Sequence, residues 1–448
     1  MRKQLIAATG LNVVAQAVGF FKLWLIARLF GVGSELDGYY LALVAPTLLS
    51  GVFSGALQTG LFPVRARLAV AGDMDLLARF ERAVLVGASA LGVLIAVLLV
   101  VLGDALRAWV APGASADTHA ALRLVWPYAA SLVALNAAGD TLSYLLAMRD
   151  RYAYAAAAPI LNALVGAGVL LAWPEGGLTS LAVSTVAGVA MQVLMCAVVL
   201  HGSNFRLTGL LCESGESGRY LGDVGHLSIK SLPWLAVGNL TMNAAPVLLA
   251  GAAEGAVSAF SYASRLHSSL IMAAIMAGSP ILLARFSELV TRRAEDAIAR
   301  ILRRALKWSA AAGLTIAAGV AVVGAPLLER VFSGRFDAVA AARVSEHWLW
   351  LSVGFSAAIA NVVFTKLWQA RERPLQLGLV YGIGFLLLVG AATLLEPWMR
   401  EYAVAVGMSV SAIGTSMLNW AWERLAGSAG SKSVVGMSTS REPPPPRG

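Results

Sequence analysis

Long apolar runs separated by short polar segments dominate the pattern along the chain. Each run has roughly the 20 apolar residues that a helix needs to cross a bilayer. The runs are continuous rather than alternating, and a lipid-exposed backbone must satisfy its own hydrogen bonds, so we predict helices and not an outer-membrane barrel. The runs lie at residues 5–30, 37–64, 83–103, 122–148, 155–173, 178–200, 228–252, 256–284, 306–328, 344–370, 375–395 and 401–423.

The composition supports a membrane protein. Of the 448 residues, 58% are hydrophobic and 13% are charged, whereas soluble proteins carry about 25% charged residues. A soluble fold could not cover its surface with so few polar side chains. The first run carries Lys22 and has no small-residue cleavage site after a short apolar core, so we interpret it as a permanent span rather than a signal peptide.

The basic residues predict the orientation. With the N-terminus placed inside, the inner segments hold roughly four times as many Lys and Arg residues as the outer loops, which is the positive-inside bias of membrane proteins. The net charge of +9 therefore reflects topology, and we expect no nucleic-acid partner. We predict a multi-pass protein of the cell inner membrane with both termini in the cytoplasm.

The two halves of the chain resemble each other. Met-Arg-Asp-Arg at 148–151 ends the fourth run, and Ala-Arg-Glu-Arg at 370–373 ends the tenth. Six spans per half would give both halves the same orientation, as in transporters built from parallel repeats. We therefore predict an all-α polytopic membrane protein with about 12 transmembrane helices, in two six-helix bundles around a central cavity.

The expected domains follow from this division. They are an N-terminal bundle at 1–200, a cytoplasmic linker at 201–227, a C-terminal bundle at 228–425 and a tail at 426–448. The tail is rich in Gly, Ser and Pro and lacks the apolar residues needed for packing, so we predict that it is disordered.

Two cations lie deep inside predicted spans of opposite halves. Lys22 in the first span and Arg265 in the eighth are each about 12 Å from the outer end, at 1.5 Å per residue. A charge at the centre of a span costs about 2.5–3.5 kcal/mol, so such side chains tend to face a cavity. The pair would suit a phosphate or pyrophosphate held between the halves; snorkelling to the interface is the alternative.

Other polar groups are weaker candidates for the same site. Arg28 is close to the end of its span, where snorkelling is common. Asp37, at the outer start of the second span, either pairs with Lys22 or Arg28 or caps its helix. Mid-span amides usually join helices, but three could line a cavity: Asn12, Gln16 and Asn239.

Asp140 is an acidic side chain about two turns from the inner end of the fourth span, and Asn136 lies one turn away. At this depth Asp140 is a candidate site for a coupling ion, either sodium or a proton, with Asn136 as a polar partner. A structural hydrogen bond is the alternative.

The sequence lacks the signatures of an enzyme. Residues 427–433 miss the Gly-Lys-Ser/Thr order of a phosphate-binding loop, and the five His residues have no metal-ligand spacing. We therefore expect a monomeric transporter, surrounded by membrane lipids, with no cofactor and no metal.

A series of short motifs resembles the MurJ/MviN lipid II flippase family, in the same order and over residues 5 to about 425. The motifs are Gly-Phe-Phe-Lys-Leu-Trp-Leu-Ile-Ala-Arg-Leu-Phe-Gly at 19–31, Asp-Gly-Tyr-Tyr at 37–40, Leu-Phe-Pro-Val at 61–64, Ala-Pro-Gly at 111–113, Trp-Pro-Tyr at 126–128, Ala-Pro-Ile-Leu-Asn at 158–162 and Tyr-Ala-Ser-Arg-Leu at 262–266.

The resemblance implies the fold of the multidrug/oligosaccharidyl-lipid/polysaccharide exporter superfamily, whose two bundles enclose a V-shaped cavity and work by alternating access. Lys22 and Arg265 stand where the family has cavity arginines, and Asp37 where it has an acidic residue. However, Ser50-Gly51 replaces a usual arginine pair, and Ser264 replaces the Asp before the arginine. Typical members also have fourteen helices. These departures favour a related polyprenyl-linked or polysaccharide substrate over lipid II itself.

Three functions remain open at this stage. The leading hypothesis is a flippase for a lipid-linked glycan precursor, with Lys22 and Arg265 holding its pyrophosphate. The second is a cation-coupled multidrug antiporter of the same superfamily, whose often cationic substrates suit these two residues poorly. The third is a membrane scaffold that transports nothing.

Overall fold

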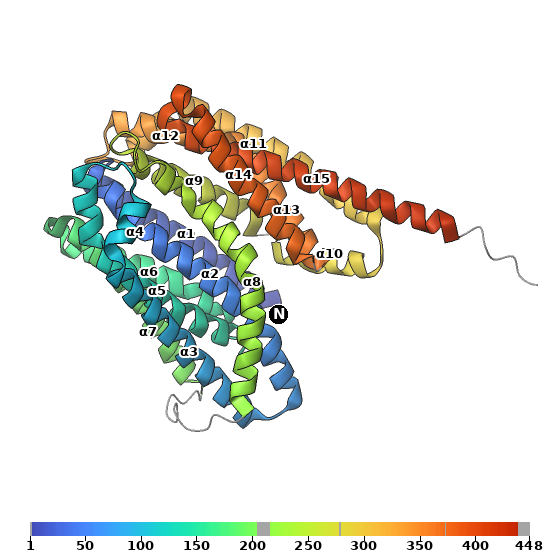
Figure 1. Ribbon diagram of the computed structural model, residues 1–448. Coiled ribbons are helices and arrows are strands. Elements are labelled where there is room, and N and C mark those ends of the chain that lie inside the picture. The colour runs from blue at the N-terminus through green and yellow to red at the C-terminus, as the bar shows by residue number, and fades with distance from the viewer. Residues whose placement is uncertain (1, 204–215, 277–278, 372, 438–448) are drawn as a thin grey trace, which may run out of the picture.

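The described chain is almost entirely helical. A computed structural model describes the backbone of residues 2–203, 216–276, 279–371 and 373–437, with side chains for most of them (Figure 1). The prediction of an all-α membrane protein is confirmed. The first group of helices is α1 (Arg2–Phe30), α2 (Ser34–Ala71), α3 (Met74–Val101), α4 (Gly103–Val110), α5 (Ala116–Ala147), α6 (Tyr152–Ala172), the short η1 (Pro174–Gly176) and α7 (Gly177–His201).

The second group follows the segment between His201 and Glu216. It comprises α8 (Glu216–Leu248), α9 (Ala256–Met276), α10 (Ser279–Thr291), α11 (Glu295–Val331), α12 (Ala338–Val353), α13 (Phe355–Ala370), α14 (Pro374–Met399), the short η2 (Arg400–Tyr402) and α15 (Ala403–Met437). We call α1–α7 the N-lobe and α8–α15 the C-lobe. The N-lobe packs through α2–α5, α3–α5 and α6–α7, and the C-lobe through α14–α15, α11–α12 and α11–α13.

Within the described residues, eight segments are long and apolar enough to cross a membrane, or nine if the pair α12–α13, bent by 49°, is one span. One of the eight, Leu375–Arg424, contains both α14 and α15, which pack side by side. Helices α8 and α9 fall below the hydropathy criterion because they carry polar residues such as Asn239, Asn243 and Arg265. The more polar helices are therefore those at the boundary between the lobes.

The structure differs from the predicted boundaries in three places. Residues 344–370 break at Gly354 into α12 and α13. Helix α8 begins at Glu216, inside the predicted linker 201–227. Helix α15 continues to Met437, inside the tail 426–448 that we predicted to be disordered, and residues 438–448 lie outside the described chain. We propose to place the boundary between the bundles in the segment that joins α7 to α8.

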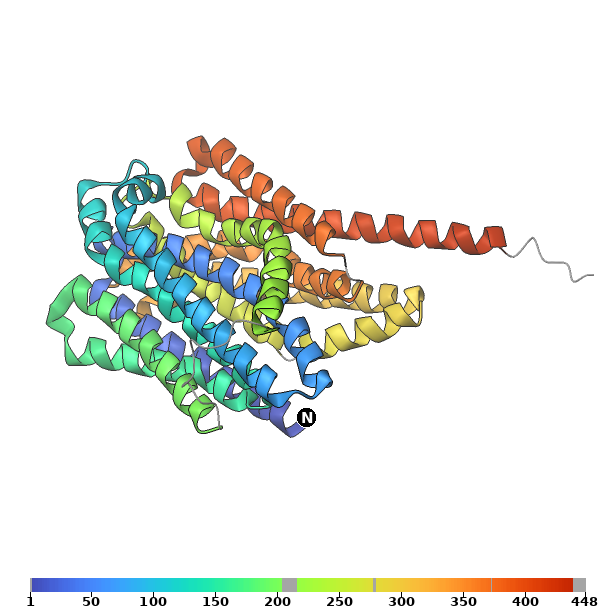
Figure 2. The ribbon, with the colours of Figure 1, turned by 60° about the horizontal axis from the view of Figure 1, so that its bottom comes forward.

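The largest hydrophobic cluster joins the two lobes at one end. We call the end where α1 meets α2 the outer end, and the opposite end the inner end, after the predicted orientation. At the outer end a single buried cluster contains residues of both lobes, among them Leu36, Tyr40, Tyr262 and Phe332. Toward the inner end, one cluster lies within the N-lobe, one lies within the C-lobe, and one joins α2 and α3 to Val224 of α8. Figures 1 and 2 show the blue and green helices of the N-lobe beside the orange and red helices of the C-lobe.

Helix α8 is the exception to this separation. Its inner half packs along α2 of the N-lobe, whereas it also contacts α14 of its own lobe. Glycines of α2 allow the close approach: a Cβ built on Gly60 would lie 2.6 Å from the backbone oxygen of Val224, and one built on Gly55 would lie 2.7 Å from Leu235. The α2–α8 contact is thus a second junction between the lobes.

Arginine-centred ion pairs hold the inner ends of both lobes. Glu81 on α3, whose side chain is 0% exposed, accepts from Arg65 on α2 at 2.7 Å and pairs with Arg149. In the C-lobe, Arg371 pairs with Glu423 on α15 and with Glu295 on α11, each at 2.6 Å. Arg149 and Arg371 are the first arginines of the two motifs that suggested an internal repeat.

Candidate functional site

Lys22 points from α1 toward α6. Its side chain is half-buried, and its ammonium group lies against Gly166: a Cβ built on Gly166 would be 2.5 Å from Lys22 Nζ and 3.0 Å from the backbone oxygen of Ser184 on α7. A side chain at position 166 would occupy the space of the ammonium group. Gly166 therefore determines where the charge of Lys22 can lie.

Arg265 faces Lys22 from the other lobe. It lies on α9 of the C-lobe, its side chain is exposed, and its charge interacts with that of Lys22 and with the phenol groups of Tyr39 and Tyr40 on α2. Lys22, Tyr39 and Tyr40 belong to the N-lobe, whereas Tyr262, whose phenol also interacts with Arg265, belongs to the C-lobe, so Arg265 lies at the boundary between the lobes. The structure thus brings together the two cations that the sequence placed at equal depth.

Neither cation is neutralised within the described chain. No carboxylate there forms an ion pair with Lys22 or Arg265. Like charges repel more strongly away from water, where the dielectric constant is low. An anion between Lys22 and Arg265 would be attracted by both and would relieve their repulsion.

A layer of tyrosines lies beside the two cations. The rings of Tyr39, Tyr40 and Tyr262 are buried, and Tyr40 contacts both of the others edge to face. Tyr39 shares a hydrogen bond of 2.7 Å with Thr185, and Tyr262 donates to the backbone oxygen of Gly31 at 3.2 Å. Tyr262 and Gly31 belong to different lobes, so this layer helps to close the outer end.

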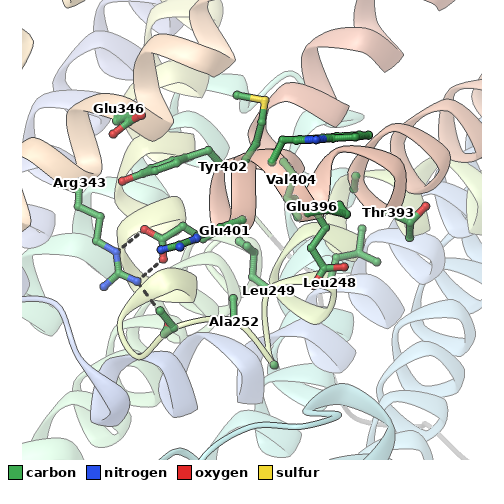
Figure 3. A pocket seen from close by; sticks show the side chains of 18 of the residues that line it. Leu248, Leu249, Ala252, Arg343, Glu346, Thr393, Glu396, Glu401, Tyr402 and Val404 are labelled. Carbon is green, nitrogen blue, oxygen red and sulfur yellow. Dashed lines mark hydrogen bonds and ion pairs between the residues drawn. The ribbon is translucent and has the colours of Figure 1, made fainter.

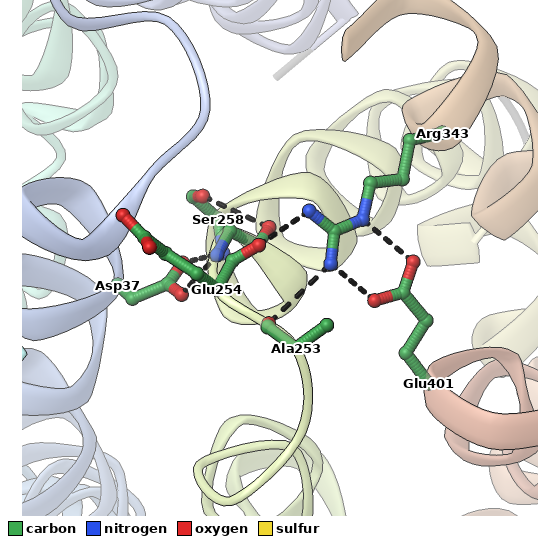
Figure 4. A network of polar contacts seen from close by, with 7 residues as sticks. Asp37, Ala253, Glu254, Ser258, Arg343 and Glu401 are labelled. Atoms are coloured by element: carbon green, nitrogen blue, oxygen red, sulfur yellow. Dashed lines mark hydrogen bonds and ion pairs between the residues drawn. The ribbon is translucent and has the colours of Figure 1, made fainter. Parts of the chain in front are cut away.

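Asp37 closes the outer end by capping a helix of the other lobe. Its buried carboxylate accepts hydrogen bonds from the backbone N–H groups of Gly255 and Ser258, both at 2.7 Å, at the start of α9 (Figure 4). A carboxylate at a helix N-terminus is stabilised by the helix dipole, by up to about 2 kcal/mol where partly buried. Our expectation was a cap on its own helix or a pair with Lys22 or Arg28; the structure shows a cap on α9 instead.

Arg343 on α12 fixes the loop that Asp37 contacts. Its guanidinium donates to the backbone oxygen of Glu254 at 2.5 Å and of Ala253 at 3.3 Å, and it forms a two-pronged ion pair with Glu401 that includes a 2.6 Å bond from Nε (Figure 4). Gly255 has a positive φ of 83°, and a Cβ there would lie 2.8 Å from Arg343. Asp37, Gly255 and Arg343 therefore belong to one network of contacts that holds the two lobes together at the outer end, which we call the outer closure.

Arg28 lies at the outer surface, away from the two central cations. Its guanidinium stacks over Trp24 at 5.3 Å, and its backbone oxygen accepts from the N–H of Arg335 at 3.1 Å. Together with Glu35 and Arg335 it lines a cavity of about 550 Å³. This position agrees with a side chain that reaches the interface.

A larger cavity of about 1470 Å³ lies at the outer end of the C-lobe (Figure 3). It is bounded by the α8–α9 connection, α12 and the turn between α14 and α15, and its charged lining comprises Arg343, Glu346, Glu396, Arg400 and Glu401. Neither Lys22 nor Arg265 lines it. This cavity is therefore separate from the space between the two cations.

The three amide candidates are placed differently. Asn239 lies in the α2–α8 contact, where its side-chain oxygen faces Gly51 and its nitrogen donates to the backbone oxygen of Leu235 at 2.9 Å. Gln16 is exposed on α1. The side chain of Asn12 lies outside the described part of the structure.

Asp140 and Asn136 belong to a polar contact between α5 and α2. Asn136 donates to Ser50 at 3.2 Å. One turn further along α2, Ser54 lies near Asp140 and shares a hydrogen bond of 2.6 Å with Tyr144. The two candidates for a coupling ion thus lie on the part of α5 that meets α2 through polar side chains.

Sequence reasoning missed several residues of the site. The positions of Tyr40 and Tyr262 could have been noted, because both lie within motifs that already carried a candidate residue. Gly166 and the Arg343–Glu401 pair left no signal, because their partners lie 144 and 58 residues away along the chain and a single sequence does not show which helices meet.

A family model and a relative in sequence agree on one family. The family "Lipid II flippase MurJ" matches residues 26–440. A relative, the probable lipid II flippase MurJ of Rhizobium meliloti (strain 1021), is 23% identical over 444 residues, which cover 94% of this chain and 80% of the relative.

Solved structures share the fold. A structure described as "Lipid II flippase MurJ, inward closed conformation" superposes with a TM-score of 0.78 at 15% identity, covering 92% of this chain and 86% of the other. An inward-facing multidrug resistance MATE family transporter of the MOP superfamily gives a TM-score of 0.75 at 17% identity, covering 97% and 96%. The expectation of a transporter rather than an enzyme is confirmed, and with a family match that extends over most of its length, the chain belongs to the MurJ family of lipid II flippases.

Proposed function

We propose that the protein moves a lipid-linked glycan precursor across the inner membrane, with the pyrophosphate of that lipid held between Lys22 and Arg265. The observation that supports this most is that the two cations interact across the lobe boundary while neither has an acidic partner among the described residues. Arg can bind phosphate oxygens through two parallel hydrogen bonds and Lys acts as a point charge, so the pair suits a compact, multiply charged anion.

Alternating access accounts for the way the lobes meet. The lobes share their core at the outer end, and Asp37 ties the start of α2 to the start of α9 there. In the proposed cycle, substrate enters from the cytoplasm in this outward-closed state. Release to the outside then requires the Asp37 contact to break and the lobes to separate at the outer end.

The substrate class that we propose is a polyprenyl pyrophosphate carrying a sugar, either lipid II or a related oligosaccharide. The names of the family and of its relatives support lipid II. The residues that replace the family's usual arginine pair support a related substrate instead. Ser50 accepts a hydrogen bond from Asn136 and Gly51 packs on Asn239, so both residues make contacts between helices and supply no positive charge for an anion. In this proposal Lys22 and Arg265 are the only cations that bind the anion.

The direct test is transport in proteoliposomes. Purified protein would be reconstituted with a fluorescent undecaprenyl pyrophosphate-linked sugar, and flipping would be followed by the accessibility of the sugar to an external enzyme. We expect Lys22→Gln and Arg265→Gln each to slow flipping at least about tenfold, since a charge-assisted hydrogen bond contributes about 1.5–3 kcal/mol.

Lys366→Gln is the matched control. Lys366 lies on α13, where its ammonium group donates to Gln369 of the same helix at 3.1 Å. The substitution Lys366→Gln removes the same charge as Lys22→Gln, but at a position away from the proposed substrate site. Flipping that is unchanged in both the Lys22 and the Arg265 variants would refute the proposed grip, and absence of flipping by the unaltered protein would refute the proposed activity.

A cation-coupled multidrug antiporter is the second candidate, because MATE transporters share the fold and Asp140 is an acid within the membrane. The same vesicles discriminate between the two candidates. Uptake of a cationic drug that depends on Asp140 and is indifferent to Lys22 and Arg265 would favour the antiporter. Two cations at the lobe boundary without an acidic partner among the described residues disfavour a cationic substrate.

A further inference from the structure

The layer of buried tyrosines lies between the two central cations and the outer end of the molecule. Tyr40 is six residues from the start of α2 and Tyr262 is six residues from the start of α9, so both lie about 9 Å from the outer ends of their helices. Lys22 is eight residues from the end of α1 and Arg265 is nine residues from the start of α9, which places them about 12–14 Å deep. An anion that leaves the two cations for the outside therefore passes the tyrosines.

The three phenol groups of this layer differ in their hydrogen bonds. Tyr39 shares one with Thr185 at 2.7 Å, and Tyr262 donates one to the backbone oxygen of Gly31 at 3.2 Å. The hydroxyl oxygen of Tyr40 is also buried, but it has no hydrogen-bond partner among the described residues. A buried polar group without a partner is destabilising, and few are found in folded proteins. The hydroxyl of Tyr40 is therefore available to a partner from outside the described chain.

The ring of Tyr40 is held beside Arg265. It packs edge to face against Tyr39 and Tyr262, with ring centroids 5.3 Å and 6.2 Å away. Residues three apart lie on one face of a helix, so the side chain of Arg265 leaves α9 next to that of Tyr262. The charge of Arg265 accordingly interacts with the phenol of Tyr40. An anion bound to Arg265 is thus next to a hydroxyl group that can donate to it.

Movement of the lobes uncovers this hydroxyl. Tyr40 belongs to the N-lobe and Tyr262 to the C-lobe, so separation of the lobes at the outer end parts the two rings that now pack together. A ligand stabilises whichever state of a protein binds it best. The affinity of the whole protein for its substrate therefore includes a contact that forms only when the rings have separated.

We propose that Tyr40 is a third ligand of the substrate anion, whose hydroxyl donates a hydrogen bond to a phosphate oxygen beside Arg265 as the lobes separate at the outer end. This inference rests on the proposed function, because it takes the anion to be the pyrophosphate of the carried lipid. A phenol donates one hydrogen bond without adding a charge. It holds the anion less tightly than a third cation would, so the anion can continue to the outside.

The first arm of the test needs no substrate and compares the thermal unfolding of three purified variants, each of which loses one hydroxyl group. Tyr39→Phe and Tyr262→Phe each lose a hydrogen bond and should unfold at lower temperatures than the unaltered protein. Tyr40→Phe loses none and should unfold at the same temperature as the unaltered protein or a higher one. If Tyr40→Phe were destabilised as much as the other two variants, its hydroxyl would have a partner within the protein, and the proposal would be overturned.

The second arm measures the binding of undecaprenyl pyrophosphate and of undecaprenol to the purified protein. Tyr40→Phe should weaken binding of the pyrophosphate about tenfold, because a hydrogen bond to a charged oxygen is lost. Binding of the alcohol, which offers no charged oxygen, should not change. Weaker binding of the pyrophosphate alone, in a variant that is no less stable, is a result that a purely structural role of Tyr40 would not give.

Tyr154→Phe is the control for the second arm. Tyr154 is 46% exposed near the inner end of α6, away from the two cations, and its substitution should leave the binding of both lipids unchanged. If the unaltered protein prefers the pyrophosphate and Tyr40→Phe binds it equally well, this inference is wrong and the proposed function stands. If the unaltered protein binds the pyrophosphate no better than the alcohol, the proposed function and this inference are both wrong.

Discussion

At the residue scale, the site depends on where small residues leave room for charged ones. The regular rise of a helix allowed the sequence to place Lys22 and Arg265 at the same depth. It could not show that the ammonium group of Lys22 lies against Gly166, because that depends on the packing of α1 on α6. Likewise, the acceptor role of Asp37 could be predicted from its position, but not that its donors lie on α9, 218 residues away in sequence from Gly255.

We predict that Gly166→Ala displaces Lys22 and weakens substrate flipping without unfolding the protein. The new Cβ would lie 2.5 Å from Lys22 Nζ, the end of a flexible side chain that can move away. Flipping rate and thermal stability of the purified protein would be measured together. Gly168→Ala, two residues along with open space around it, is the control and should leave both unchanged.

We predict that Asp37→Asn loosens the outer closure. The amide keeps one acceptor oxygen but loses the charge that the start of α9 stabilises, a loss of about 1–2 kcal/mol. Labelling of a cysteine introduced at Val32 by a membrane-impermeant reagent should become about tenfold faster. Glu35→Gln, an exposed acid in the same turn of α2, should not change the rate; equal labelling in both variants would contradict the capping role.

At the scale of the elements, the apolar pattern predicted where helices lie better than where they break. The bend at Gly354 was missed, because residues 344–370 remain apolar across it. The polar residues that lower the hydropathy of α8 and α9 were interpreted from sequence as cavity-lining or as helix contacts. The structure places Asn239 in the α2–α8 contact and directs Arg265 at the other lobe.

We predict that Gly60→Ala forces α8 away from α2. The added methyl group would lie 2.6 Å from the backbone oxygen of Val224, which cannot move without its helix. Arg67 and Asp223, which pair at 3.1 Å across the same contact, provide cysteine positions for cross-linking. Cross-linking of this cysteine pair should fall markedly in Gly60→Ala and stay unchanged in Gly87→Ala, where α3 has open space.

We predict that Glu81→Gln destabilises the protein more than Glu423→Gln. Glu81 is fully buried and is the shared partner of Arg65 and Arg149, so its loss approaches the roughly 3–5 kcal/mol of a broken buried ion pair. Arg371 retains Glu295 when Glu423 is changed, which limits the loss to about 1 kcal/mol. Thermal unfolding in one detergent would rank the two variants, and the reverse order would contradict this account of the inner ends.

At the scale of the whole molecule, sequence patterns predicted the fold class, and short motifs predicted the family. Which lobes touch, and at which end, could not be predicted, because the outer core and the Asp37 closure are contacts between segments far apart in the chain. The central claim that remains is chemical: two cations from opposite lobes hold one pyrophosphate.

The most direct measurement of that claim is binding by purified protein of three lipids with the same polyprenyl chain: a pyrophosphate, a monophosphate and an alcohol. We predict that affinity falls in that order, that Lys22→Gln and Arg265→Gln each weaken pyrophosphate binding at least about tenfold, and that the double variant no longer distinguishes the three lipids. Equal affinity for all three lipids in the unaltered protein, or undiminished pyrophosphate binding in the double variant, would contradict the claim.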